Sequence, residues 1–110
     1  MKDTIKNIEI WAENKSLIKK ENSYKQFAKL VEEVAEVGTA LNNNDIEELK
    51  DGVGDCAIVL IILSLQNGLN FEDCLKSAYE VIKNRTGKTV GGVFVKDKPE
   101  IGCPFDEEFK

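Results

Sequence analysis

Two acids, Asp51 and Asp55, precede an uninterrupted apolar run in the centre of the chain, residues 56–63, and Asp55 is directly next to it. In a helix, steps of four and seven residues from Asp55 reach Val59 and Ile62, so these acids share the face that an apolar helix must bury. An isolated buried carboxylate costs several kcal/mol. The sequence therefore predicts that both carboxylates look inward, where they must be protonated, paired or bound to a metal ion.

Further acids lie on the preceding helical stretch and at the start of the long helix. Glu33 flanks the apolar stripe of the first stretch, with Glu36 about 60° away around the helix. The chain has no His, and all-oxygen ligands suit a hard cation such as Mg²⁺ or Mn²⁺. We predict these metal ligands: Glu33, Glu36, Glu48, Asp51 and Asp55. The alternative is a solvated charged face with ordinary ion pairs such as Lys29 to Glu33.

Apolar residues recur at helical spacing in four segments, residues 3–13, 23–42, 45–66 and 70–85. Polar residues typical of N-caps lie at the start of the last three: Ser23, Asn44 and Asn70. Gly91-Gly92 within residues 89–95 indicates a two-residue hairpin turn. We therefore expect an all-α four-helix bundle with a small C-terminal β-hairpin, as one domain over residues 1–96 followed by a tail over residues 97–110.

The composition limits the partners and the compartment. A net charge of −5 and a pI near 4.8 argue against nucleic-acid or membrane-surface binding. Cys56, Cys74 and Cys103 lack the spacing of a zinc site and are expected as reduced thiols, the first two buried within helices as small apolar side chains. With no signal peptide, this predicts a cytoplasmic protein. The long helix is apolar nearly all round from Cys56, which favours an oligomer interface.

Basic residues gather at the end of the fourth predicted helix: Lys83, Asn84, Arg85 and Lys88. They are either a C-terminal turn that the helix dipole favours or contacts to phosphate groups. Metal-binding acids together with phosphate-binding cations indicate a polyphosphate substrate. Trp11 is either a core or interface anchor or a stacking platform for a nucleotide base. Neither a Walker loop nor a GxGxxG motif is present.

Taken together, these motifs resemble those of the MazG-like all-α nucleoside triphosphate pyrophosphohydrolases. That group includes dimeric dUTPases, dCTP pyrophosphatases and phosphoribosyl-ATP pyrophosphohydrolase. The resemblance rests on Glu32-Glu33-x-x-Glu36 followed by Glu48-x-x-Asp51, on QFAKLVEEVAEV around the first motif, and on GDCAIVLIIL and IKNRTGK-x-V-x-GVFVK downstream. It covers about residues 5–96 and is strongest to the small MazG-like proteins of bacteria and their phages.

The resemblance implies hydrolysis of an NTP or dNTP to the monophosphate and pyrophosphate, by Mg²⁺-dependent water attack at the α-phosphorus, as in clearance of unwanted nucleotides. Glu33, Glu36, Asp51 and Asp55 would hold Mg²⁺. Glu32, with Glu33, would serve catalysis by orienting the attacking water. Family members form dimers or tetramers, so a homo-oligomer is expected.

One departure from the family pattern leaves the ligand pair on the long helix open. The acid that directly precedes the apolar run is Asp55, not Asp51. The pair is Glu48 with Asp51 by the literal motif, or Asp51 with Asp55 by position. Two other classes of function are also open, namely a non-catalytic nucleotide- or metal-binding helical module and a purely structural helical oligomer. Release of pyrophosphate would separate an enzyme from both.

Overall fold

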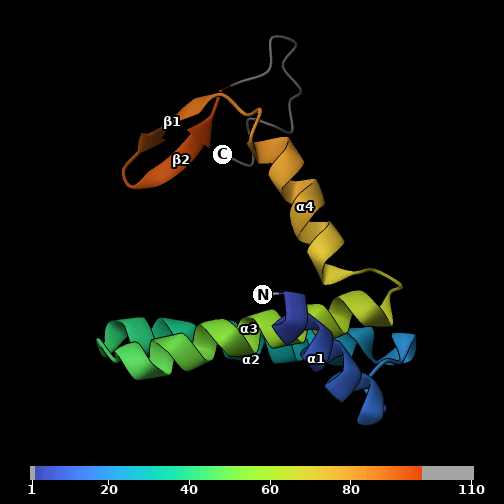
Figure 1. Cartoon of the computed structure of the whole chain (residues 1–110). Helices are drawn as coiled ribbons and strands as arrows, with labels where there is room; N and C mark the ends of the chain where they lie inside the picture. Colours follow the sequence, from blue (N-terminus) through green and yellow to red (C-terminus); the bar gives the residue numbers. More distant parts are fainter. Residues whose placement is uncertain (1, 98–110) are drawn as a thin grey trace. The chain divides into compact units, whose positions relative to one another are not determined.

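The computed structural model describes residues 2–97, and the chain divides into two compact units, Met1–Leu75 and Lys76–Lys110 (Figure 1). Its elements are α1 (Lys2–Asn14), the 3₁₀ turn η1 (Lys20–Asn22), α2 (Ser23–Asn42), α3 (Ile46–Gln66), α4 (Phe71–Ile82), β1 (Gly87–Val90) and β2 (Val93–Lys96). Four helices and a hairpin confirm the expected fold class. The boundary between the units follows Leu75 along the chain, and the expected single domain over residues 1–96 stays a prediction. The predicted tail, apart from Asp97, lies outside the described residues.

Helices α2 and α3 lie side by side along their length and form the centre of the first unit (Figure 1). The turn between them places Asn44 at φ 53°, in the left-handed region that Asn tolerates. Gly52 explains how closely the helices approach, because a Cβ there would lie 2.9 Å from Cγ2 of Val37. Gly54, in contrast, has no such neighbour among the described residues.

Helix α1 packs on α3, and the buried apolar side chains of the first unit come from these helices and α2. They are Ile5, Ala12, Ala40, Val59, Ile61 and Ile62. Polar bonds tie the end of α3 to the connection between α1 and α2. Gln66 Nε2 donates to the carbonyl of Leu17 at 2.9 Å, and Asn67 Nδ2 donates to Ser23 Oγ at 3.0 Å. The segment before α2 is thereby held against the end of α3.

The helix starts differ from two of the three predicted caps. Ser23 is the first residue of α2 rather than its cap, and its hydroxyl donates to the carbonyl of Lys20 at 2.8 Å. Asp45, not Asn44, caps α3, because its carboxylate accepts the N–H of Glu48 at 3.1 Å. The third cap is confirmed: Asn70 Oδ1 accepts the N–H of Asp73 at 3.1 Å, just before the first turn of α4.

In the second unit, β1 and β2 pair antiparallel, with Val90 opposite Val93. Gly91 and Gly92 have φ of 58° and 82°, as a two-residue hairpin turn requires, which confirms the predicted turn. Helix α4 ends at Ile82, three residues short of the predicted end at residue 85.

Within the described residues, no single helix is long and apolar enough to span a bilayer. Only α3 and α4 taken as a pair have the required length and composition, and the chain bends sharply between them. The expectation of buried thiols is wrong for Cys74, which is exposed, whereas Cys56 is half-buried.

Candidate functional site

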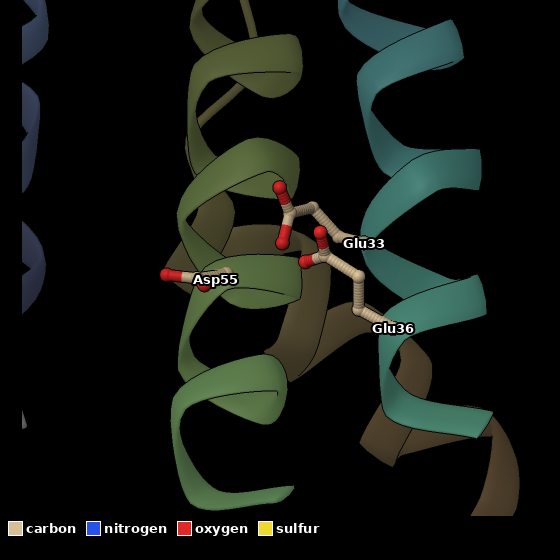
Figure 2. A group of neighbouring side chains, drawn as sticks. All are labelled: Glu33, Glu36 and Asp55. Carbon is tan, nitrogen blue, oxygen red and sulfur yellow. The ribbon is translucent and has the colours of Figure 1, made fainter. Parts of the chain in front are cut away.

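Three of the predicted metal ligands meet between α2 and α3. Glu33 and Glu36 extend from α2 toward α3, which carries Asp55 (Figure 2). One carboxylate oxygen from each residue lies within 4.8 Å of the others. This is possible because residues three apart lie on the same side of α2 and because that side faces α3. We call Glu33, Glu36 and Asp55 the carboxylate cluster.

Glu33 is the buried member of the cluster, with only 5% of its surface exposed. Its Oε1 lies 3.2 Å from Nζ of Lys29, one turn earlier on the same helix. Its Oε2 is buried and has no hydrogen-bond donor within the described part of the chain. Buried carboxylate oxygens normally have a donor or a cation. The free oxygen therefore fits a cation bound by the cluster, and the donor set of three carboxylates suits a hard divalent ion.

The electrostatics of the cluster also favour a bound cation. The pKa of Glu36 is raised, first because its protonated form can share a hydrogen bond with Glu33 and second because of the negative charge on Glu33. Lys29 opposes this shift, and the charge of Asp55 adds to it. The pKa of Lys29 is raised mainly by its hydrogen bond to Glu33 and by the charge of that carboxylate. One lysine does not neutralise three carboxylates, so the cluster attracts further positive charge.

The cluster opens onto a pocket of about 580 Å³ within the first unit. Glu33 and Asp55 contribute to its wall, beside the indole of Trp11 from α1. The remaining lining residues are Leu17, Gln26, Lys29, Ile58, Val59 and Ile62. The pocket thus combines an apolar wall, an aromatic ring that is half exposed, and an acidic end. This is the combination that a small ligand with an apolar body and a cation-bound polar group requires.

The other predicted ligands on α3 stand apart from the cluster. Glu48 and Asp51 are exposed and do not belong to it. The expectation that Asp51 and Asp55 are both buried is wrong, since each is exposed. Asp55 nevertheless lines the pocket, whereas Asp51 does not. At the level of Asp51 the residue that α3 buries against α2 is Gly52, which lies about 100° further around the helix. Metal binding by Glu48 and Asp51 stays a prediction.

The remaining predicted residues occupy two regions. Glu32 is exposed beside the cluster, with its Oε2 3.8 Å from Nζ of Lys29. In the second unit, Lys83 Nζ lies 2.7 Å from Oε2 of Glu80, and Asn84 Nδ2 donates to the carbonyl of Glu80 at 3.2 Å. Contacts of phosphate groups with Lys83, Asn84, Arg85 and Lys88 stay a prediction.

Sequence reasoning did not place Gln26 in the pocket. Its signal was present, because Gln26, Lys29 and Glu33 follow one another at steps of three and four residues and therefore share one face of α2. The same spacing did indicate the ion pair of Lys29 with Glu33, which the structure confirms. Leu17 and Ile58 carried no comparable signal, since an apolar residue in a pocket wall has the same pattern as one in a core.

Comparison with known proteins adds a family and one relative. A family model described as phosphoribosyl-ATP pyrophosphohydrolase matches residues 1–82. An uncharacterized 18.2 kDa protein of Haemophilus phage HP1 (strain HP1c1), from the rep-hol intergenic region, is 40% identical over 70 residues. The match covers 64% of this chain and 43% of that relative, so the chain spans less than half of the relative's length. No solved structure gives a significant match.

Proposed function

Because this chain belongs to the phosphoribosyl-ATP pyrophosphohydrolase family of MazG-like all-α proteins, we propose that it is a Mg²⁺-dependent nucleoside triphosphate pyrophosphohydrolase. The reaction would be NTP or dNTP plus water to the nucleoside monophosphate and pyrophosphate. The observation that carries the proposal is the carboxylate cluster at the end of a pocket large enough for a small ligand. The family implies pyrophosphohydrolase chemistry, and the cluster supplies the ligands for a metal that such chemistry uses.

Glu33, Glu36 and Asp55 would hold the metal ion. When bound, a divalent cation of this kind neutralises phosphate oxygens and makes a bound water a better nucleophile. The free Oε2 of Glu33 is the atom best suited to the ion, because it is buried without a donor. Asp51 and Glu48 remain candidates for a further ion.

The side chains of this chain would position the substrate and receive the proton. Glu32 or Glu33 would accept the proton of the attacking water, since Glu33 belongs to the cluster, Glu32 lies beside it and no His is present. Trp11 would contact the base or sugar, because its ring lines the same pocket as Glu33 and Asp55. Lys83, Arg85 and Lys88, with Asn84, would contact the phosphates.

The test is pyrophosphate release from a panel of canonical and modified NTPs with Mg²⁺ or Mn²⁺. Asp55→Asn and Asp51→Asn form a matched pair, since both replace an exposed aspartate on α3 and only Asp55 belongs to the cluster. We expect release by the wild type and its loss in Asp55→Asn. Retention in Asp51→Asn would confine the required ligands to the cluster. Loss in both variants would add Asp51 to the ligands.

A stability measurement separates the enzyme from a binding module. The melting temperature of each protein is compared with and without Mg²⁺, because an ion that binds the fold raises it. A Mg²⁺-dependent rise that Asp55→Asn abolishes, without turnover of any nucleotide, would favour the non-catalytic module. Turnover that is the same in Asp55→Asn as in the wild type would contradict the proposed site.

A further inference from the structure

Helices α2 and α3 are antiparallel, and two contacts fix their register (Figure 1). Val37 lies beside Gly52 toward the turn that joins the helices, and at the other end Asn67 Nδ2 donates to Ser23 Oγ at 3.0 Å. Each step toward the N-terminus of α2 therefore corresponds to one step toward the C-terminus of α3. The residues of both helices that line the pocket lie between these two contacts, so the pocket extends along the helices.

This register gives the pocket two ends that differ in chemistry. Asp55 is nearly level with Glu33 at the acidic end, and Ile62 is nearly level with Gln26 at the other. Seven residues separate the two ends on each helix, which is roughly 10 Å. Leu17 belongs to the second end, because its carbonyl is bonded to the last residue of α3. The second end is thus apolar apart from the carboxamide of Gln26, and we call it the amide end.

Gln26 supplies the polar group of the amide end. Its side chain is half-buried in the pocket wall, and its carboxamide has no hydrogen-bond partner among the described residues. Of the described residues that line the pocket, it alone is uncharged and can both donate and accept a hydrogen bond. Because no described neighbour fixes which way it faces, the carboxamide can present its oxygen and its NH₂ group in either order. It is therefore suited to a ligand edge that carries one donor beside one acceptor.

We propose that Gln26 reads the hydrogen-bonding edge of the nucleobase and accepts any edge that carries one donor beside one acceptor. The inference rests on the proposed function, which supplies a nucleotide with its phosphate groups at the acidic end and hence its base at the amide end. Uracil presents a carbonyl acceptor beside the N3–H donor, and cytosine presents an amino donor beside the N3 acceptor. A carboxamide that can turn over complements either edge, while Trp11 in the pocket wall offers a face on which the ring can stack.

Charge disfavours the opposite orientation of the nucleotide. Phosphate groups at the amide end would lie against Leu17, Ile62 and a neutral carboxamide, while the uncharged base would lie against the carboxylates of Glu33 and Asp55. An ionised carboxylate is an acceptor only, so it cannot pair with the acceptor that each of these base edges carries. The roughly 10 Å between the two ends leaves room for the sugar between the base and the phosphate groups.

The test uses the fluorescence of Trp11, which is the single tryptophan of the chain and part of the pocket wall. The probes are uridine, cytidine and 3-methyluridine, in which a methyl group replaces the N3–H donor. Nucleosides carry no phosphate, so their binding needs neither a metal ion nor turnover. We expect the full chain to bind uridine and cytidine with similar dissociation constants and 3-methyluridine roughly tenfold more weakly, because the carboxamide then loses its partner.

Gln26→Leu and Lys25→Leu are a matched pair of variants, since both place leucine on the same turn of α2 and only Gln26 lines the pocket. We expect Gln26→Leu to weaken the binding of uridine and cytidine roughly tenfold and to lose the preference for uridine over 3-methyluridine. Lys25→Leu should bind all three nucleosides as the wild type does. Circular dichroism checks the folding of both variants, and the comparison of the nucleosides on the wild type needs no variant.

Equal binding of uridine and 3-methyluridine by the wild type would overturn the proposal. So would wild-type affinity in Gln26→Leu, or a fluorescence that none of the nucleosides changes. A preference of roughly tenfold or more for one of uridine and cytidine would overturn the claim that the carboxamide turns over. Pyrophosphate release separates this inference from the proposed function. Nucleoside binding of the expected pattern without hydrolysis of any NTP would refute the enzyme alone, whereas hydrolysis with an unchanged KM for UTP and CTP in Gln26→Leu would refute the reading of the base alone.

Discussion

Replacing Gly52 with alanine should push α2 and α3 apart, whereas the same change at Gly54 should stabilise the fold. At Gly52 the new Cβ would lie 2.9 Å from Cγ2 of Val37 and 3.6 Å from its Cα. Valine is restricted to few rotamers in a helix, so its methyl group cannot simply turn away. At Gly54 no described atom lies within 4 Å of the new Cβ.

The expected magnitudes follow from two opposing effects. Alanine in place of glycine inside a helix is worth about 1 kcal/mol, and overpacking a tight contact costs roughly 1–3 kcal/mol. Gly54→Ala should therefore gain up to about 1 kcal/mol. Gly52→Ala should be less stable than Gly54→Ala by roughly 1–3 kcal/mol, since both share the helix effect and only one has the clash.

The assay is urea denaturation followed by circular dichroism, at one protein concentration and without divalent cations. Val37→Ala, alone and combined with Gly52→Ala, completes a double-mutant cycle. The combined variant should regain most of the stability that the clash costs, because the smaller side chain at position 37 leaves room for the new Cβ. Equal stabilisation by Gly52→Ala and Gly54→Ala, or an additive cycle, would refute the close contact as the cause.

Three further predictions concern the cluster and the connection before α2. The raised pKa of Glu36 makes a contribution to the metal-free fold that is present at low pH and is lost as pH rises through the folded-state pKa. Mg²⁺ binding by the wild type should weaken as pH falls through that same pKa. Melting temperatures against pH, with and without Mg²⁺, should show both effects in the wild type, and the contribution to the metal-free fold should be absent in Glu36→Gln. Lys29→Met should lower the melting temperature without metal and enlarge the rise on adding Mg²⁺, because the buried Glu33 loses its cation; an unchanged rise would show that the two cations do not compete. Gln66→Met keeps the volume but removes the bond to the carbonyl of Leu17 and should cost about 1 kcal/mol in urea denaturation, and unaltered stability would mean that water replaces this bond fully.

Hydrophobic periodicity and turn chemistry were enough to predict the helices and the hairpin. Four apolar-periodic segments became four helices, and Gly91-Gly92 became the hairpin turn, because each signal is local. The caps of α2 and α3 were harder. Asn44 and Asp45 are adjacent and both of a capping type, and only the backbone conformation, left-handed at Asn44 and extended at Asp45, decides which caps the helix.

For the site, helical faces identified Glu33, Glu36 and Asp55 but could not separate Asp51 from Asp55. The two aspartates lie about 40° apart around α3, a smaller difference than a sequence can resolve into two environments. What separates them is the neighbour at each level: α3 presents Gly52 to Val37 of α2 near Asp51, and it faces the pocket with Trp11 near Asp55. Both are contacts between different segments of the chain, and the periodicity of a single segment cannot predict them.

The carboxylate cluster is confined to α2 and α3, which a turn of three residues joins. Contacts between neighbouring segments form with little loss of chain entropy, so this pair of helices is expected to assemble early in folding. The bond of Gln66 with Leu17, across 49 residues, and the docking of α1 close much longer loops and should come later. The acids would then be together before Trp11 completes the pocket, and a divalent cation could bind and stabilise a folding intermediate that cannot yet hold a nucleotide.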